Sequence, residues 1–202
     1  MVTHCCYEPF PDSTETDGVR VNFSLPFDRV LQFYDLFSEK GGILTEAEKV
    51  ECVYDWFVKS PKKASPEFKV KAIDRIVRDY ISQEKKGSGG EKLYDFRADS
   101  SYIYSSFMLA YGLDLFSEHG RLPWWKFVSL FEGLPEDSKI KKVIEIRARP
   151  FPKSERNNQE MINQLAELKR VYALPVSREE REKAANDGWN RLFDMMLSKG
   201  GG

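Results

Sequence analysis

Residues 122–138 read LPWWKFVSLFEGLPEDS and predict a helix with a start signal at one end and a stop signal at the other. Trp124 and Trp125 are adjacent in this stretch, which therefore holds two of the four tryptophans of the chain. Neighbouring helical side chains point about 100° apart, so both indoles cannot lie on one narrow core stripe. Apolar residues at Val128 and Phe131 place apolar neighbours on both faces and favour burial of both indoles. The alternative is that one indole faces a partner.

Helix signals continue on either side of this stretch. Thr45 and Glu48 form a capping box, and Ser65 precedes Pro66 in the arrangement typical of a helix start. Gly112 is placed as a C-terminal cap. Apolar spacing between these signals predicts about seven helices. They begin near residues 27, 45, 66, 98, 123, 138 and 154.

The one convincing β region lies within residues 7–24. Val19 and Val21 alternate with polar residues directly after an Asp17-Gly18 turn signal. A small hairpin is therefore expected to open the protein.

These elements predict a mainly α fold: a compact bundle of about seven helices with a small N-terminal β-hairpin and a helical C-terminal extension. A glycine-rich stretch and a charged tail suggest the internal boundaries. The expected parts are a hairpin segment at 1–24, a helical domain at 25–175 with candidate lobes 25–82 and 93–175 joined by a linker at 83–92, and a charged, amphipathic extension at 176–202.

The composition favours a globular protein over nucleic-acid or membrane binding. Hydrophobic residues make up 41% of 202, and 31 basic residues are balanced by 32 acidic ones. Phosphate binding needs clustered positive charge, so nucleic acid is not expected as a partner. No apolar run reaches the roughly 20 residues of a membrane helix, and the N-terminus lacks a signal-peptide pattern, so a cytoplasmic location is expected.

Candidate catalytic and metal-binding residues are few. His4 lies beside Cys5 and Cys6, but the chain offers no second Cys/His pair at ligand spacing. His119 lies in a loop without a nearby nucleophile signature, and Cys52 lies on a helix where a buried, inert thiol is the usual outcome. No catalytic, cofactor-binding or metal-binding residues are therefore expected, and a binding protein is favoured over an enzyme.

Aromatic residues make up 13% of the chain, more than one helical stripe can bury. Tyrosine and tryptophan are favoured anchors in protein interfaces. The candidate partner-binding residues are Tyr102, Tyr104, Trp124, Trp125, Phe127, Trp189, Phe193 and Met196.

The last of these candidates belong to the C-terminal extension. Trp189, Leu192, Phe193, Met196 and Leu197 share one face at helical spacing. An apolar face of this kind must dock either on its own domain or on another molecule.

Several blocks of sequence together resemble a known family. They are 9–13 (PFPDS) with 17–18 (DG), 27–30 (FDRV), 94–96 (YDF), 99–104 (DSSYIY), 111–115 (YGLDL), 122–127 (LPWWKF), 133–137 (GLPED), Arg147 and 168–174 (LKRVYAL). In this order they resemble the bacteriophage gp-fifteen proteins, which are encoded in the tail-assembly region of phages and prophages of Gram-positive bacteria. Pro123 stands where the family pattern has a histidine, which is compatible with proline at the first helical position. The residues after about 176 extend beyond the resemblance.

The resemblance implies a non-enzymatic tail-assembly chaperone in the host bacterial cytoplasm. Such a protein would bind the phage tape-measure protein and help to recruit tail-tube subunits. The alternative is a structural virion protein, such as a tail completion or connector component. Both a monomer and a homo-oligomer are compatible with the sequence, and the family brings no catalytic residues with it.

Overall fold

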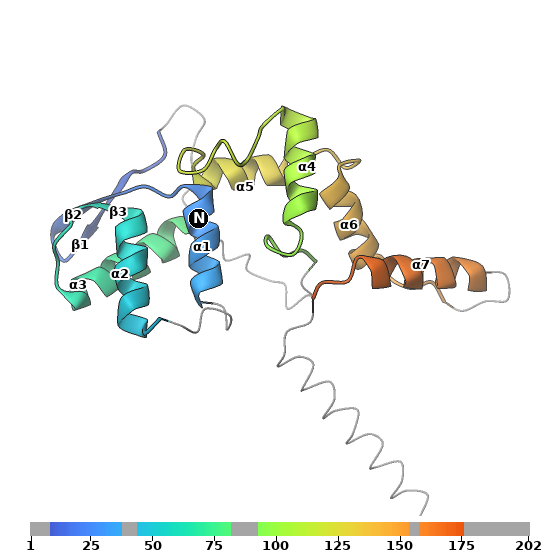
Figure 1. Cartoon of the computed structure of the whole chain (residues 1–202), viewed down its shortest axis with the longest axis horizontal. Helices are drawn as coiled ribbons and strands as arrows, with labels where there is room; N and C mark the ends of the chain where they lie inside the picture. The colour runs from blue at the N-terminus through green and yellow to red at the C-terminus, as the bar shows by residue number, and fades with distance from the viewer. Residues whose placement is uncertain (1–8, 38–43, 82–92, 154–157, 176–202) are drawn as a thin grey trace, which may run out of the picture. The chain divides into compact units, whose positions relative to one another are not determined.

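The computed structural model of the chain describes residues 9–37, 44–81, 93–153 and 158–175 (Figure 1). Over these residues the fold is mainly α, with a small antiparallel sheet near the N-terminus, as the sequence predicts. The helices are α1 (Phe27–Phe37), α2 (Glu46–Phe57), α3 (Pro66–Ile76), α4 (Ser100–Tyr111), α5 (Trp124–Glu132), α6 (Lys139–Ala148) and α7 (Gln159–Val171). Val77–Ile81 continues α3 as a π-helical turn. No helix in the described ranges is both long enough and apolar enough to span a membrane.

The chain divides into two compact units, each assembled from two separate stretches of sequence. The first unit comprises Met1–Glu91 and Ser100–Lys142, and the second comprises Lys92–Asp99 and Val143–Gly202. The first unit therefore includes residues from both sides of the predicted linker at 83–92. The linker itself lies outside the described residues.

The N-terminal hairpin forms as its turn signal predicts. Strands β1 (Ser13–Thr16) and β2 (Val19–Phe23) pair antiparallel with Thr16 opposite Val19. Asp17 and Gly18 have φ of 48° and 75°, so both turn residues occupy the left-handed region that a two-residue hairpin turn needs. A third strand, β3 (Val58–Ser60), pairs with β2 and was not predicted from the sequence. In Figure 1 the strands lie beside α2 and α3.

The predicted caps start α2 and α3. The Thr45 hydroxyl accepts a hydrogen bond from the Glu48 amide at 3.3 Å, while the Glu48 carboxylate accepts one from the Thr45 amide at 2.8 Å. Ser65 caps α3 by accepting from the amide of Phe68 at 3.3 Å, with Pro66 at the first helical position. Each cap satisfies amides that the helix itself leaves without an acceptor.

Phe127 is the centre of the aromatic core of the first unit. Its ring stacks on Phe27 of α1 with centroids 4.9 Å apart, on Phe107 of α4 at 5.3 Å and on Trp124 of its own helix at 5.6 Å. These rings are all buried. The stack therefore ties α1, α4 and α5 together through one side chain.

Backbone hydrogen bonds connect the starts of α1 and α5. The amide of Phe27 donates to the Leu122 carbonyl at 2.9 Å, and the amide of Trp124 donates to the Leu25 carbonyl at 2.7 Å. Pro123 lies between these contacts at the N-cap of α5, with φ −66° and ψ 148°. The expectation of proline at the first helical position is wrong by one residue, because the extended backbone of Pro123 belongs to this short pairing.

The second unit is held by a buried ion pair. Nη1 and Nη2 of Arg147 each lie 2.7 Å from an oxygen of Asp99, and both side chains are buried. Nη1 also donates to the Leu93 carbonyl at 2.9 Å, and Nε donates to the Tyr172 carbonyl at 2.6 Å. One guanidinium therefore joins α6 to the segment before α4 and to the end of α7.

Candidate interaction surface

The adjacent tryptophans of α5 have different environments. Trp124 is 5% exposed and belongs to the aromatic core, whereas Trp125 is 40% exposed. The expected burial of both indoles is therefore wrong for Trp125. Because α5 contacts α1 and α4 on the side that carries Trp124, the next residue is turned about 100° away from those contacts.

The exposed indole of Trp125 is part of a small aromatic group that we name the Trp125 surface: Phe10, Tyr80 and Trp125. Phe10 stacks on Trp125 with centroids 5.6 Å apart and an interplanar angle of 15°. Tyr80, from the π-helical turn, meets the Phe10 ring edge-on at 6.0 Å. The stack covers part of the indole and leaves the rest open to solvent.

A second set of apolar residues, spread over adjoining sides of the helix, lies at the C-terminal end of α4 and in the loop that follows. We name it the α4 surface: Tyr104, Met108, Leu109 and Phe116. Leu109 is 85% exposed and Phe116 is 69% exposed, the highest values among the large apolar side chains of the described residues. The rings of Phe116 and Tyr104 lie 5.1 Å apart, which connects the loop to the helix.

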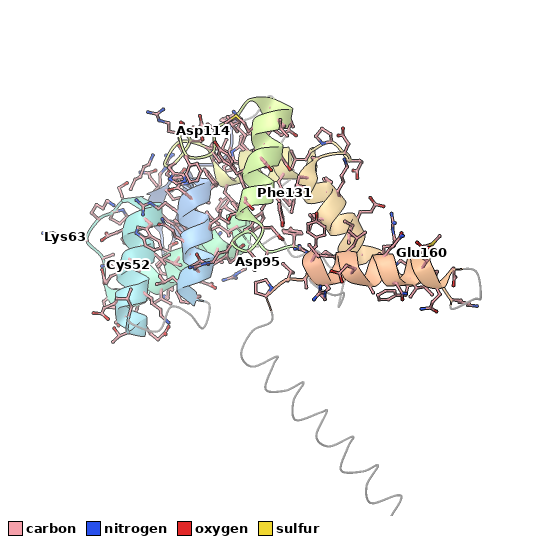
Figure 2. The ribbon with its side chains drawn as sticks, turned by 45° about the vertical axis from the view of Figure 1, so that its right-hand side comes forward. Cys52, Lys63, Asp95, Asp114, Phe131 and Glu160 are labelled. Atoms are coloured by element: carbon pink, nitrogen blue, oxygen red, sulfur yellow. The ribbon has the colours of Figure 1, made fainter. Side chains whose placement is uncertain are left out.

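Asp114 fixes the loop that carries Phe116. Its carboxylate accepts hydrogen bonds from the Phe116 amide at 3.0 Å and from the Ser117 hydroxyl at 2.7 Å. The Ser117 hydrogen bond is the main reason that the pKa of Asp114 lies below its ordinary value of 3.8. Asp114 is labelled at this loop in Figure 2. The turn therefore holds Phe116 in an exposed position before any partner binds.

The predicted partner-binding residues are distributed over different environments. Tyr104 lies in the α4 surface, and Trp125 lies in the Trp125 surface. Tyr102 is half-buried, with the Lys139 ammonium 5.4 Å from its ring centre. Trp124 and Phe127 are buried in the core, so a partner cannot reach them without opening the first unit. Trp189, Phe193 and Met196 lie outside the described residues.

Met108, Leu109 and Phe116 were not among the predicted partner-binding residues. The signal that could have found them is the composition of α4. Its sequence SSYIYSSFMLAY carries apolar or aromatic residues on nearly every side of the helix, whereas a helix at the protein surface buries only one side. The excess apolar residues must then be exposed or meet a partner.

A cavity in the first unit is lined mostly by charged side chains. It has a volume of about 400 Å³ and is lined by Thr16, Asp17, Lys71, Asp74, Arg75, Arg78 and Asp79. Its charged groups form ion pairs: Lys71 with Asp17 at 2.8 Å, Arg75 with Asp79 at 3.4 Å, and Arg78 with Asp74. Because each base faces an acid, the cavity has no excess charge to select an ionic ligand.

The other residues considered for chemistry are scattered. Cys52 is half-buried in α2 rather than fully buried, and His119 is an exposed loop residue whose ring lies 5.9 Å from Phe116. Among the described residues, no three His, Cys, Asp or Glu side chains are grouped so that they could hold a metal ion. His4, Cys5 and Cys6 lie outside the described residues.

Comparison with protein families identifies a match. The family model described as Bacteriophage Gp15 protein matches residues 7–174, which include almost all of the described chain. No curated protein and no solved structure matches significantly. The match supports a structural or tail-related phage protein.

Proposed function

Because the chain belongs to the bacteriophage Gp15 protein family, we propose that it is a non-enzymatic tail-assembly chaperone. It would bind the phage tape-measure protein in the host bacterial cytoplasm and help to recruit tail-tube subunits. The observation that carries this proposal is the α4 surface, where Leu109 and Phe116 are exposed on an ordered helix and loop. Exposed apolar groups of this kind are typical of sites that bind proteins.

The proposed mechanism is masking of apolar helix faces. A long helical protein that waits for its tube subunits exposes apolar stripes that would otherwise self-associate. An amphipathic helix can lay such a stripe against apolar side chains of a partner. The α4 surface offers Met108 and the rings of Tyr104 and Phe116 for this contact, with Leu109 on the adjoining side of the helix. The hydrogen bonds of Asp114 hold the Phe116 loop in place.

The Trp125 surface is a second candidate contact for the same partner. Trp125 is stacked on Phe10 and therefore loses little side-chain freedom when its open face is covered. Since Trp125 and the α4 surface both belong to the first unit, the proposal needs only that unit for recognition.

Co-expression with the tape-measure protein tests the proposal. The full-length chain should keep the tape-measure protein soluble and co-purify with it. The double variant Leu109→Ser/Phe116→Ser should lose the complex, while Val70→Ser should retain it. Val70 is a suitable control because it is also an exposed apolar residue of the first unit, but lies on α3. Equal recovery of the complex with all three proteins would contradict the proposed surface.

Mass spectrometry of purified phage particles separates this proposal from the alternative of a structural virion protein. A chaperone that is released after assembly should be absent from mature particles. A tail completion or connector component should be present at a fixed number of copies relative to the tail proteins. Its presence at such a ratio would favour the alternative.

A further inference from the structure

An apolar strip runs along α7 in the second unit. Met161 and Val171 are each 62% exposed, and Leu168 between them is also exposed. At helical spacing these three residues lie on one side, while Leu165 on the adjoining side is buried. Glu160, labelled in Figure 2 near the start of α7, lies at the edge of this strip. We name Met161, Leu168 and Val171 the α7 strip.

We propose that the C-terminal segment of the same chain, residues 189–197, docks on the α7 strip. The segment reads WNRLFDMML and, as a helix, places Trp189, Phe193 and Met196 on one face. The distance along a helix from Trp189 to Met196 is about 10 Å, which equals that from Met161 to Leu168. Each apolar face would then cover the other.

The position of the segment in the chain supports this pairing. The described chain ends at Pro175, four residues after Val171, and residues 176–188 connect it to the segment. An extended link of this length reaches about 40 Å, whereas α7 is only about 20 Å long. A tether this short keeps the segment near the α7 strip at an effective concentration on the order of millimolar, far above that of a free partner.

The charges favour an antiparallel arrangement. In that arrangement Trp189 would lie near Val171, where the link begins, and the segment would run back toward Gln159. Lys199 follows the apolar face and would then reach the end of α7 that carries Glu160, whose charge is opposite. This ion pair would be exposed, so it selects the direction of the pairing more than it strengthens it.

Hydrogen exchange of the full-length protein, followed by mass spectrometry, tests the inference. The amides of residues 189–197 should exchange at least about tenfold more slowly than expected for an unprotected chain, which corresponds to a segment that is docked about nine-tenths of the time. Val171→Glu should abolish this protection because it places a charge in the strip. Ala166→Glu should preserve it, since Ala166 is exposed on the opposite side of α7.

A variant in the C-terminal segment tests the same contact without altering α7, so that unfolding of α7 cannot explain the result. Phe193→Glu should speed exchange of α7 without changing exchange in the first unit, because Phe193 would contact only the strip. Dilution distinguishes this docking from pairing between two copies, since only intramolecular protection is independent of protein concentration. Three results would each overturn the inference. The wild-type segment could show no protection, or its protection could survive Val171→Glu. The protection could also disappear on dilution together with a dimer.

Discussion

Arg147 connects three parts of the second unit that lie far apart in the sequence. Its guanidinium is shared by the Asp99 carboxylate and two backbone carbonyls, at Leu93 and Tyr172. These positions lie in or next to the blocks 94–96, 99–104 and 168–174 that carry the family resemblance. In the second unit, therefore, the resemblance follows residues that hold the fold together rather than residues grouped for chemistry.

Replacement of Arg147 by leucine should lower the free energy of unfolding by about 3–5 kcal/mol, because it leaves the Asp99 carboxylate buried without its partner. Arg147→Lys should also destabilise the protein, since lysine cannot make the two parallel hydrogen bonds. Arg149→Leu is the matched control, because Arg149 and Glu145 form an exposed pair worth at most about 1 kcal/mol. Urea unfolding measures all three. Equal effects of Arg147→Leu and Arg149→Leu would contradict the assigned role of Arg147.

The two tryptophans of α5 should respond differently to truncation. Trp124→Ala removes a buried ring from the aromatic core and should cost about 3–5 kcal/mol. Trp125→Ala should cost clearly less, since its ring is 40% exposed and stacks mainly on Phe10. Thermal unfolding by circular dichroism compares the variants. A larger loss for Trp125→Ala than for Trp124→Ala would show that the core has been assigned to the wrong indole.

At the scale of elements, the start of α2 predicts a pH-dependent stability. The backbone amide and then the hydroxyl of Thr45 lower the pKa of the Glu48 carboxyl from its ordinary value of 4.5. A carboxyl whose pKa is lower in the folded state stabilises that state above the unfolded pKa, and this contribution disappears as the pH falls through the folded pKa. Wild type should therefore exceed Glu48→Gln in stability at neutral pH, and the difference should vanish in acid.

Urea unfolding of both proteins between pH 7 and pH 3 measures this difference. In a Thr45→Ala background the pH dependence should be smaller, because the hydroxyl contribution is lost while the backbone amide remains. A constant difference between wild type and Glu48→Gln across the pH range would contradict the assigned cap.

Local signals predicted most of the elements. The apolar spacing after Pro26 predicted the start of α1 near Phe27, and the caps at Thr45 and Ser65 predicted the starts of α2 and α3. Gly112, with φ of 62°, ends α4 as expected. Such signals are reliable because capping and left-handed turns depend on residues a few positions apart.

Long-range features could not be predicted in the same way. Strand β3 has only three residues and is defined by its pairing with Asn22 and Phe23, which lie far away in the sequence. The pair of Arg147 with Asp99 joins residues 48 positions apart. Its one local signal was a charged residue on the apolar stripe of Ile140, Val143 and Ile144, and that signal does not identify the partner. Which aromatic residues are exposed depends on the same long-range packing.

At the scale of the whole molecule, the exposed apolar side chains should determine how the free protein interacts. The double variant Leu109→Glu/Phe116→Glu should bind less of a hydrophobic dye such as ANS and should tolerate higher salt before it precipitates, because it loses the two most exposed apolar groups of the α4 surface. Val70→Glu is the control on α3, where it replaces one exposed apolar residue and adds one of the two negative charges. If Val70→Glu reduced dye binding as much as the double variant does, the α4 surface would not be the main apolar surface of the protein.

The stacking of Phe27 on Phe127 also has a consequence for biosynthesis. The two rings lie a hundred positions apart, so α1 cannot make its main aromatic contact until α5 has been translated. Closure of this long loop is expected to slow folding of the first unit relative to folding through local contacts. During translation the nascent N-terminal half would present the bare face of α1 to the ribosome surface and to host folding factors. A protein that we propose to be a chaperone would thus pass through a stage in which it needs protection itself.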